Sequence, residues 1–135
     1  MAVPGPGSLS GVAIYACDVA RLCDFYVTVL GLTVVERDDG YAVLAGAAGE
    51  VSVVAIPKEI AQGIVITAPP QLREETPVKP VFVVADLAVA ATRAAAAGGG
   101  SKEPSAAWTF RGLRRLDGWD PEGNVIQLAE RDPVP

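Results

Sequence analysis

The chain of 135 residues repeats one pattern twice, and this repeat constrains its fold more than any other feature. An aspartate follows an apolar stretch at Asp18 and again at Asp86. A glycine opens a second apolar stretch at Gly49 and again at Gly123. Because an internal repeat marks a duplicated structural unit, we expect two similar units in this chain.

Each aspartate is placed to cap a helix, since a short acidic side chain can bond the free backbone N–H groups of a first turn. Residues 19–30 carry an apolar stripe at helical spacing and end at Gly31, a residue that favours helix termination. The second helix is expected after Asp86 and ends at the glycines 98–100. The stripe of the first helix consists of Leu22, Phe25, Tyr26 and Val29.

Apolar alternation and turn residues predict the strands. In the first half these are residues 10–17, 32–37, 41–45 and 50–56; in the second half they are 80–85, 102–103, 108–113, 115–119 and 124–130. The resulting class is α+β, with two tandem βαβββ modules. We expect a flexible leader at 1–8, a first module at 9–57, a linker at 58–79 with a helical turn at 58–62, a second module at 80–130 and a tail at 131–135.

Charge and composition exclude several classes of partner. The net charge is −5 and the basic residues are scattered, so nucleic acid and anionic membranes are not expected partners. No apolar run reaches the roughly 18 residues that a membrane helix needs. The first residues lack the features of a signal peptide, and the two cysteines fit a reducing compartment, so we expect a cytoplasmic protein.

The stretches 12–19, 25–32, 83–87 and 120–124 together resemble the two modules of the vicinal oxygen chelate superfamily, which includes glyoxalases, bleomycin-resistance proteins and extradiol dioxygenases. The resemblance covers residues 9–130. It implies sheets curled around a cleft and a homodimer, with pairing of modules within or across chains left open. It also implies, for the enzymes of the superfamily, a divalent metal held by four side chains, usually His, Glu or Gln.

The metal-ligand positions of the superfamily carry almost no ligands in this chain. They fall on Gly11, Val53, Pro80 and Gln127. Only the glutamine offers an oxygen, and the chain has no histidine. A shift of one or two positions would bring in Glu50 or Ser52, without supplying a histidine. We therefore expect no metal and no cofactor.

Alternation from those positions predicts an apolar cleft, because ligand positions of the superfamily face it. The predicted ligand-binding residues are Tyr15, Val53, Phe82, Trp108, Phe110 and Gln127. Other predicted cleft residues are Ala13, Val51, Ala55, Val84, Val125 and Ala129, whereas Val12, Ile14, Val81, Val83, Ile126 and Leu128 are expected to pack on the helices. No carboxylate or histidine pair is expected in the cleft, so we assign no catalytic residue.

Several of these residues keep two interpretations. Trp108 can stack on a ligand or pack in the core or a dimer interface, and Phe110 can lie in the cleft or the core. Gln127 can contact a ligand or fill the empty metal position. Arg115, with its arginine neighbours 111 and 114, is interpreted as part of a solvated strand face, with contact to an acidic ligand as the minor alternative. Trp119 is expected to pack.

The function predicted from these features is metal-independent binding. A hydrophobic, aromatic natural product would be sequestered, as in antibiotic self-resistance by bleomycin-resistance-like proteins. The alternative is a metal-free isomerase, cyclase or hydrolase of secondary metabolism that uses Tyr15, Gln127 or Glu50. A regulatory module without either role is a third, weaker interpretation. The emptied metal positions and the lack of paired carboxylates favour binding over catalysis.

Overall fold

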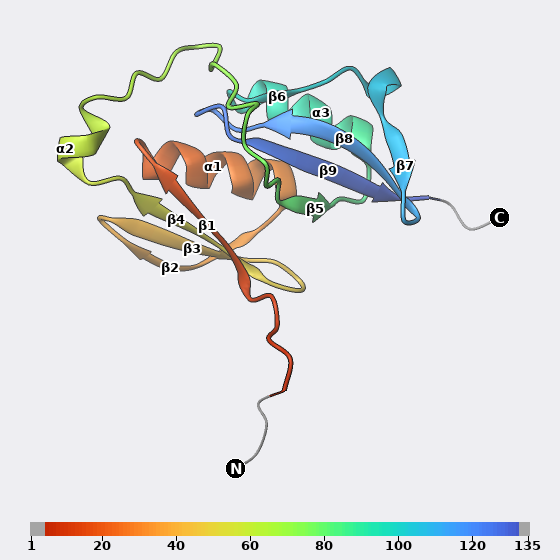
Figure 1. Ribbon diagram of the computed structural model, residues 1–135, viewed down its shortest axis with the longest axis horizontal. Coiled ribbons are helices and arrows are strands. Elements are labelled where there is room, and N and C mark those ends of the chain that lie inside the picture. The colour runs from red at the N-terminus through yellow and green to blue at the C-terminus, as the bar shows by residue number, and fades with distance from the viewer. Residues whose placement is uncertain (1–4, 133–135) are drawn as a thin grey trace.

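The computed structural model describes residues 5–132, which form two mixed β-sheets and their helices (Figure 1). This arrangement confirms the predicted α+β class. Of the expected leader and tail, residues 1–4 and 133–135 lie outside the described residues. No helix in the described part of the chain has the length and hydrophobicity to cross a membrane.

The first sheet is built by residues 11–55. Its strands lie in the order β1-β4-β3-β2. Strand β1 runs parallel to β4, and the other neighbouring strands are antiparallel. The elements are β1 (Gly11–Ala16), α1 (Val19–Leu30), β2 (Thr33–Asp38), β3 (Tyr41–Ala45) and β4 (Glu50–Ala55). The parallel pairing of β1 with β4 requires a crossover connection, which α1 and the β2–β3 hairpin supply.

The second sheet repeats this topology with residues 81–131. Its strands lie in the order β5-β9-β8-β6, β7 pairs with β8, and β5 runs parallel to β9. The elements are β5 (Val81–Val83), α3 (Leu87–Ala96), β6 (Gly100–Ser101), β7 (Trp108–Phe110), β8 (Leu113–Trp119) and β9 (Val125–Arg131), with a 3₁₀ turn at Pro104–Ala106. The parallel pairs β1–β4 and β5–β9 each join the first and last strand of a unit, as the repeated sequence pattern predicts.

The caps of α1 agree with the sequence. The Asp18 side chain accepts a hydrogen bond from the Arg21 backbone N–H at 3.0 Å, and Gly31 adopts a left-handed φ of 68° while its N–H bonds the Val27 carbonyl. In α3 the Asp86 side chain accepts in the same way from the Val89 N–H at 3.0 Å. Both predicted helix starts are confirmed, and α1 has the predicted bounds.

One predicted strand is shorter than expected. The sequence predicts a strand through residues 108–113, but β7 ends at Phe110 and a two-residue turn follows. Arg111 and Gly112 have φ values of 55° and 73°, which suit the tight turn of a β-hairpin. The turn folds β7 back onto β8 and places Phe110 opposite Leu113.

The connection between the sheets contains α2 (Lys58–Ala61), within the predicted helical turn. Further along, the Arg73 N–H donates to the Gly123 carbonyl oxygen at 2.9 Å. Gly123 has a φ of 84°, and a Cβ there would collide with the Gln71 carbonyl oxygen. Only glycine therefore allows this segment to lie against the turn before β9.

The core lies between the sheets and the two long helices. Helix α1 packs on β3 and β4, α3 packs on the second sheet, and the helices touch each other. The largest fully buried apolar or aromatic side chains are Tyr26, Phe25, Leu22, Leu44, Leu87, Leu116, Ile126 and Leu128. Each sheet thus buries one face against a helix, which leaves the other face open.

Candidate functional site

The open face of the first sheet carries Tyr15 but not Val53. Tyr15 is 58% exposed, whereas Val53 is completely buried. In the register Val53 pairs with buried Ile14, while Val54 pairs with Tyr15. Because paired residues of neighbouring strands share a face, the predicted orientation of Val53 is wrong. Val51 and Val53 therefore lie in the core, and the alternate residues Ser52 and Val54 face the open side.

The predicted orientation of β5 is also wrong. Phe82 pairs with buried Leu128 and packs against the core, its ring 5.9 Å from that of Tyr26. Val81 and Val83, which were expected on the helix side, are exposed instead. Val81 pairs with Gln127, and the two therefore share the open face of the second sheet.

Three of the six predicted ligand-binding residues do share one face. Along the β7–β8 hairpin Trp108 pairs with Arg115 and Phe110 with Leu113, and on β9 Gln127 pairs with Asp117. Trp108 is 42% exposed and Phe110 is 56% exposed, so neither ring belongs to the core. The open face of the second sheet thus combines two accessible aromatic rings with one amide.

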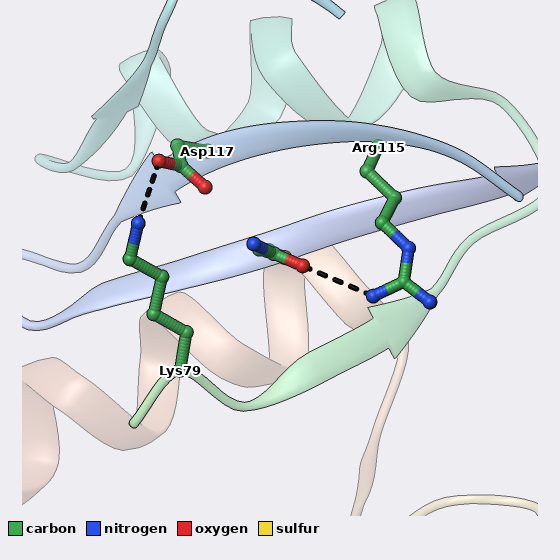
Figure 2. A network of polar contacts seen from close by, with 4 residues as sticks. Lys79, Arg115 and Asp117 are labelled. Carbon is green, nitrogen blue, oxygen red and sulfur yellow. Dashed lines mark hydrogen bonds and ion pairs between the residues drawn. The ribbon is translucent and has the colours of Figure 1, made fainter. Parts of the chain in front are cut away.

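This face also carries charged groups that the sequence interpretation missed. Lys79 Nζ pairs with Asp117 Oδ2 at 2.9 Å, and Arg115 Nη1 donates to Gln127 Oε1 at 3.1 Å. Figure 2 shows Arg115 and Asp117 side by side on β8, with Lys79 reaching toward the aspartate from the segment before β5. The interpretation of Arg115 as part of a solvated strand face is therefore wrong, whereas the expected lack of a carboxylate pair stays a prediction.

A signal for these groups was present in the sequence. Leu116 is fully buried, so its neighbours Arg115 and Asp117 must point to the opposite side of β8. The prediction treated Arg115 as one of three clustered arginines, which hid this alternation. Arg114, one position earlier, is exposed and donates to the Pro104 carbonyl oxygen at 3.2 Å.

The bonding of this charged group is incomplete. The Phe110 ring lies over the Arg115 guanidinium, with its centroid 5.0 Å from Cζ. Arg115 Nε and Asp117 Oδ1 are both enclosed and have no hydrogen-bond partner. Unsatisfied enclosed polar atoms are uncommon in folded proteins, and they mark places where another group is needed.

A hollow adjoins this charged face at the end of β8. It has a volume of about 190 Å³ and is lined by Leu72, Glu74, Lys79, Lys102, Asp117, Trp119 and Val125. Trp119 also packs on Gly100, where a Cβ would collide with the indole ring. Trp119 therefore has a packing role, as expected, while its exposed part borders the hollow. A second hollow of about 240 Å³ lies under the linker beside Glu122.

Two further carboxylates are buried in the turn before β9. Asp120 Oδ2 accepts from the Tyr26 hydroxyl and from Asn124 Nδ2, each at 2.8 Å, while Oδ1 accepts from the Glu122 and Asn124 N–H groups. Glu122 accepts from the backbone N–H groups of Cys17 and Asp18, each at 2.8 Å. Burial raises the pKa of Asp120, although these hydrogen bonds oppose the shift. The turn therefore ties the second sheet to the start of α1.

The metal that the superfamily implies does not fit these side chains. Gln127 Oε1 already accepts from a guanidinium, whose positive charge would repel a metal ion. Val53 is buried, and the side chains of Gly11 and Pro80 contain no atom that can bind a metal. Residues 5–132 contain no group of three or more His, Cys, Asp or Glu side chains that could hold a metal.

The model of a glyoxalase-like domain family matches residues 11–129, which is most of the chain. The chain belongs to this family. Its members fall in the vicinal oxygen chelate superfamily, as the sequence stretches suggested. No curated protein matches this glyoxalase-like domain.

Solved structures share the fold of this glyoxalase-like domain at low sequence identity. A glyoxalase/bleomycin resistance protein/dioxygenase family enzyme from Burkholderia phytofirmans is 20% identical, with a TM-score of 0.68 over 93% of this chain and all of that one. An integron cassette protein from V. cholerae is 17% identical, with a TM-score of 0.65 over 96% and 99% of the two chains. The fosfomycin resistance protein FosX from Mesorhizobium loti is 13% identical, with a TM-score of 0.66 over 95% of each chain.

Proposed function

We propose that this glyoxalase-like domain binds a small aromatic molecule on the open face of its second sheet and sequesters it without a metal. The observation that carries the proposal is the accessible pair Trp108 and Phe110 beside the incompletely bonded Arg115. Aromatic rings at a partly polar site suit flat ligands, because a ring face contributes stacking while a few polar groups fix orientation. Sequestration acts by mass action and needs no catalytic group.

The proposed biological role is resistance to an antibiotic natural product. Proteins with this fold include a fosfomycin resistance protein and proteins described as glyoxalase/bleomycin resistance, which supports the role by analogy of fold. A cytoplasmic location is part of the proposal, supported by the free thiols of Cys17 and Cys23.

A homodimer is also proposed, and the charges of the two open faces support it. By register, the first sheet presents Glu36, Asp38 and Glu50 on its open face. The second sheet presents Arg131 on its open face, and the charge of its Asp117 is neutralised by Lys79. Pairing of the first sheet of one copy with the second sheet of another would bring opposite charges together. Analytical ultracentrifugation should show a dimer that weakens with added salt, and a monomer at all concentrations would contradict this part.

The test of binding is a titration with aromatic natural products followed by tryptophan fluorescence. The bound ligand is then recovered, and its mass is measured by mass spectrometry. An unchanged mass is expected, and a converted product would identify an enzyme instead.

Replacement of Trp108 tests whether the open face is the binding site. Trp108→Ala should weaken the affinity of any ligand found roughly three- to tenfold, the equivalent of one lost stacking contact, with little change in stability. Calorimetry measures the affinity because the variant loses a fluorophore. Thr109→Ala is the control, since Thr109 pairs with Arg114 on the opposite face of the same hairpin. Unchanged affinity in Trp108→Ala would remove the open face from the proposal.

A further inference from the structure

The side chain of Arg115 has one bonded nitrogen, one stacked face and two nitrogens, Nε and Nη2, without a hydrogen-bond partner. Nη1 donates to Gln127, and the guanidinium face lies under the Phe110 ring. The remaining side of the guanidinium presents Nε together with Nη2, and Nε is enclosed without a partner. Of these two nitrogens only Nη2 is accessible, and its N–H groups can donate to a carboxylate oxygen.

The charge of Arg115 is also unmatched. The ion pair in the described part of the chain joins Lys79 to Asp117, and Arg115 has no carboxylate partner among residues 5–132. Lys79 neutralises Asp117, so the neighbouring aspartate does not cancel the positive charge of Arg115. Partly buried charges in proteins are normally paired, which indicates that the partner of Arg115 comes from outside this chain.

We propose that the ligand of this site is an aromatic carboxylate whose carboxylate accepts hydrogen bonds from the accessible Nη2 of Arg115. The inference rests on the proposed binding function and specifies its ligand class. Trp108 lies directly across the hairpin from Arg115, and Phe110 covers its face. These rings favour an aromatic acid over an aliphatic glutamate or aspartate from a second copy of the chain.

The Arg115 guanidinium lies beside a position that the superfamily resemblance assigns to a metal ligand. It binds Gln127, the one superfamily ligand position that carries a donor in this chain. A fixed positive charge at that position can bind an anion without a metal ion. A neutral aromatic compound would leave the positive charge of Arg115 as it is now, without an anionic partner.

Two probes that differ only in charge provide the test. Phenylacetate and phenylacetamide are titrated into nitrogen-labelled protein, and the Arg115 Nε–H and Trp108 indole N–H signals are followed by NMR. Phenylacetate should bind about tenfold more tightly than the amide, because a charge-assisted hydrogen bond exceeds a neutral one by that order. The Arg115 Nε–H signal should move with the acid alone.

Three variants locate the preference. Arg115→Gln should abolish the preference for the acid, and Arg115→Lys should lose most of it because an ammonium lacks the planar face that stacks on Phe110. Arg114→Gln is the matched control, with the same change of charge one residue away on the opposite face, and it should retain the full preference. Circular dichroism confirms that each variant is folded.

Each other outcome overturns the inference in a recognisable way. Equal binding of the two probes at Trp108 would exclude a preference for carboxylate ligands and would leave the proposed binding function intact. A preference that survives in Arg115→Gln would place the anion elsewhere. If Arg115→Gln instead disrupts a dimer and leaves probe affinities unchanged, the partner of Arg115 is a carboxylate of a second copy.

Discussion

Two groups of polar side chains in this protein differ in how completely their atoms are bonded. In the turn before β9 both oxygens of Asp120 and both oxygens of Glu122 accept hydrogen bonds from protein donors. On the open face Arg115 Nε and Asp117 Oδ1 have none. Both groups contain carboxylates, and both lie on or next to β8 and β9.

The difference separates a structural role from a binding role. A buried network in which every atom is satisfied stabilises one conformation and has no capacity for a ligand. A group with free donors and acceptors gives less to stability and keeps the capacity to bind. We therefore expect changes in the turn to alter unfolding free energy and changes on the open face to alter affinity.

The largest expected effect comes from Asp120→Ala. The substitution leaves the buried Tyr26 hydroxyl and three N–H donors without their acceptor, so we expect a loss of about 3 kcal/mol in unfolding free energy. Urea denaturation measures it. The matched change Asp117→Ala removes a partly exposed ion pair and should cost less than about 1 kcal/mol. Equal losses in the two variants would end the distinction between the two groups.

The next effect is expected from Glu122→Ala. Glu122 bonds the backbone N–H groups of Cys17 and Asp18, and it lies 105 and 104 residues away from them in the chain. We expect a loss of about 2 kcal/mol, and faster hydrogen exchange at these two amides. Glu130→Ala, at the other end of β9, is the control for loss of one carboxylate. Unchanged exchange at Cys17 and Asp18 would show that the turn does not hold the start of α1.

The smallest effect concerns alkaline pH. Burial, followed by the nearby Asp120 carboxylate, raises the pKa of the Tyr26 hydroxyl well above its usual value of 10. The folded state therefore holds this proton more tightly than the unfolded chain. The resulting stability is fully present below about pH 10 and is lost as the pH rises further.

Tyr26→Phe should flatten this alkaline loss and should cost about 1 kcal/mol at neutral pH through the missing hydrogen bond to Asp120. Denaturation curves from neutral to alkaline pH give both quantities. Tyr15→Phe is the control, because Tyr15 lies on the open face. An alkaline limb that is the same in Tyr26→Phe and in the unmodified protein would contradict the assignment.

Local signals in the sequence predicted the elements well. The Asp18 and Asp86 caps, Gly31 and the apolar alternation depend on residues within a few positions of each other, so the helices and most strands could be placed. Strand orientation failed at Val53 and Phe82 because it was anchored on superfamily positions. The pairing of Val53 with buried Ile14 fixes the orientation of β4, and this register is not visible in the sequence.

The polar contacts could not be predicted in the same way. The bond from Tyr26 to Asp120 joins residues 94 positions apart, and it exists only because α1 packs next to the turn before β9. The sequence marked residues 120–124 as a turn, and no periodicity could show that its carboxylates are buried. The contact of Arg115 with Gln127 depends on the register of β8 and β9, which the turn between them sets.

The tight turn at Arg111 and Gly112 has a consequence for how such domains diversify. Strand β7 hydrogen-bonds only to β8 in the described sheet, and Phe110 comes just before the turn. Insertions at 111–112 would change the side chains that cover the Arg115 guanidinium and would leave the core around α1 and α3 unchanged. Mutations in one hairpin turn can therefore change the ligand specificity of the domain with little effect on its stability.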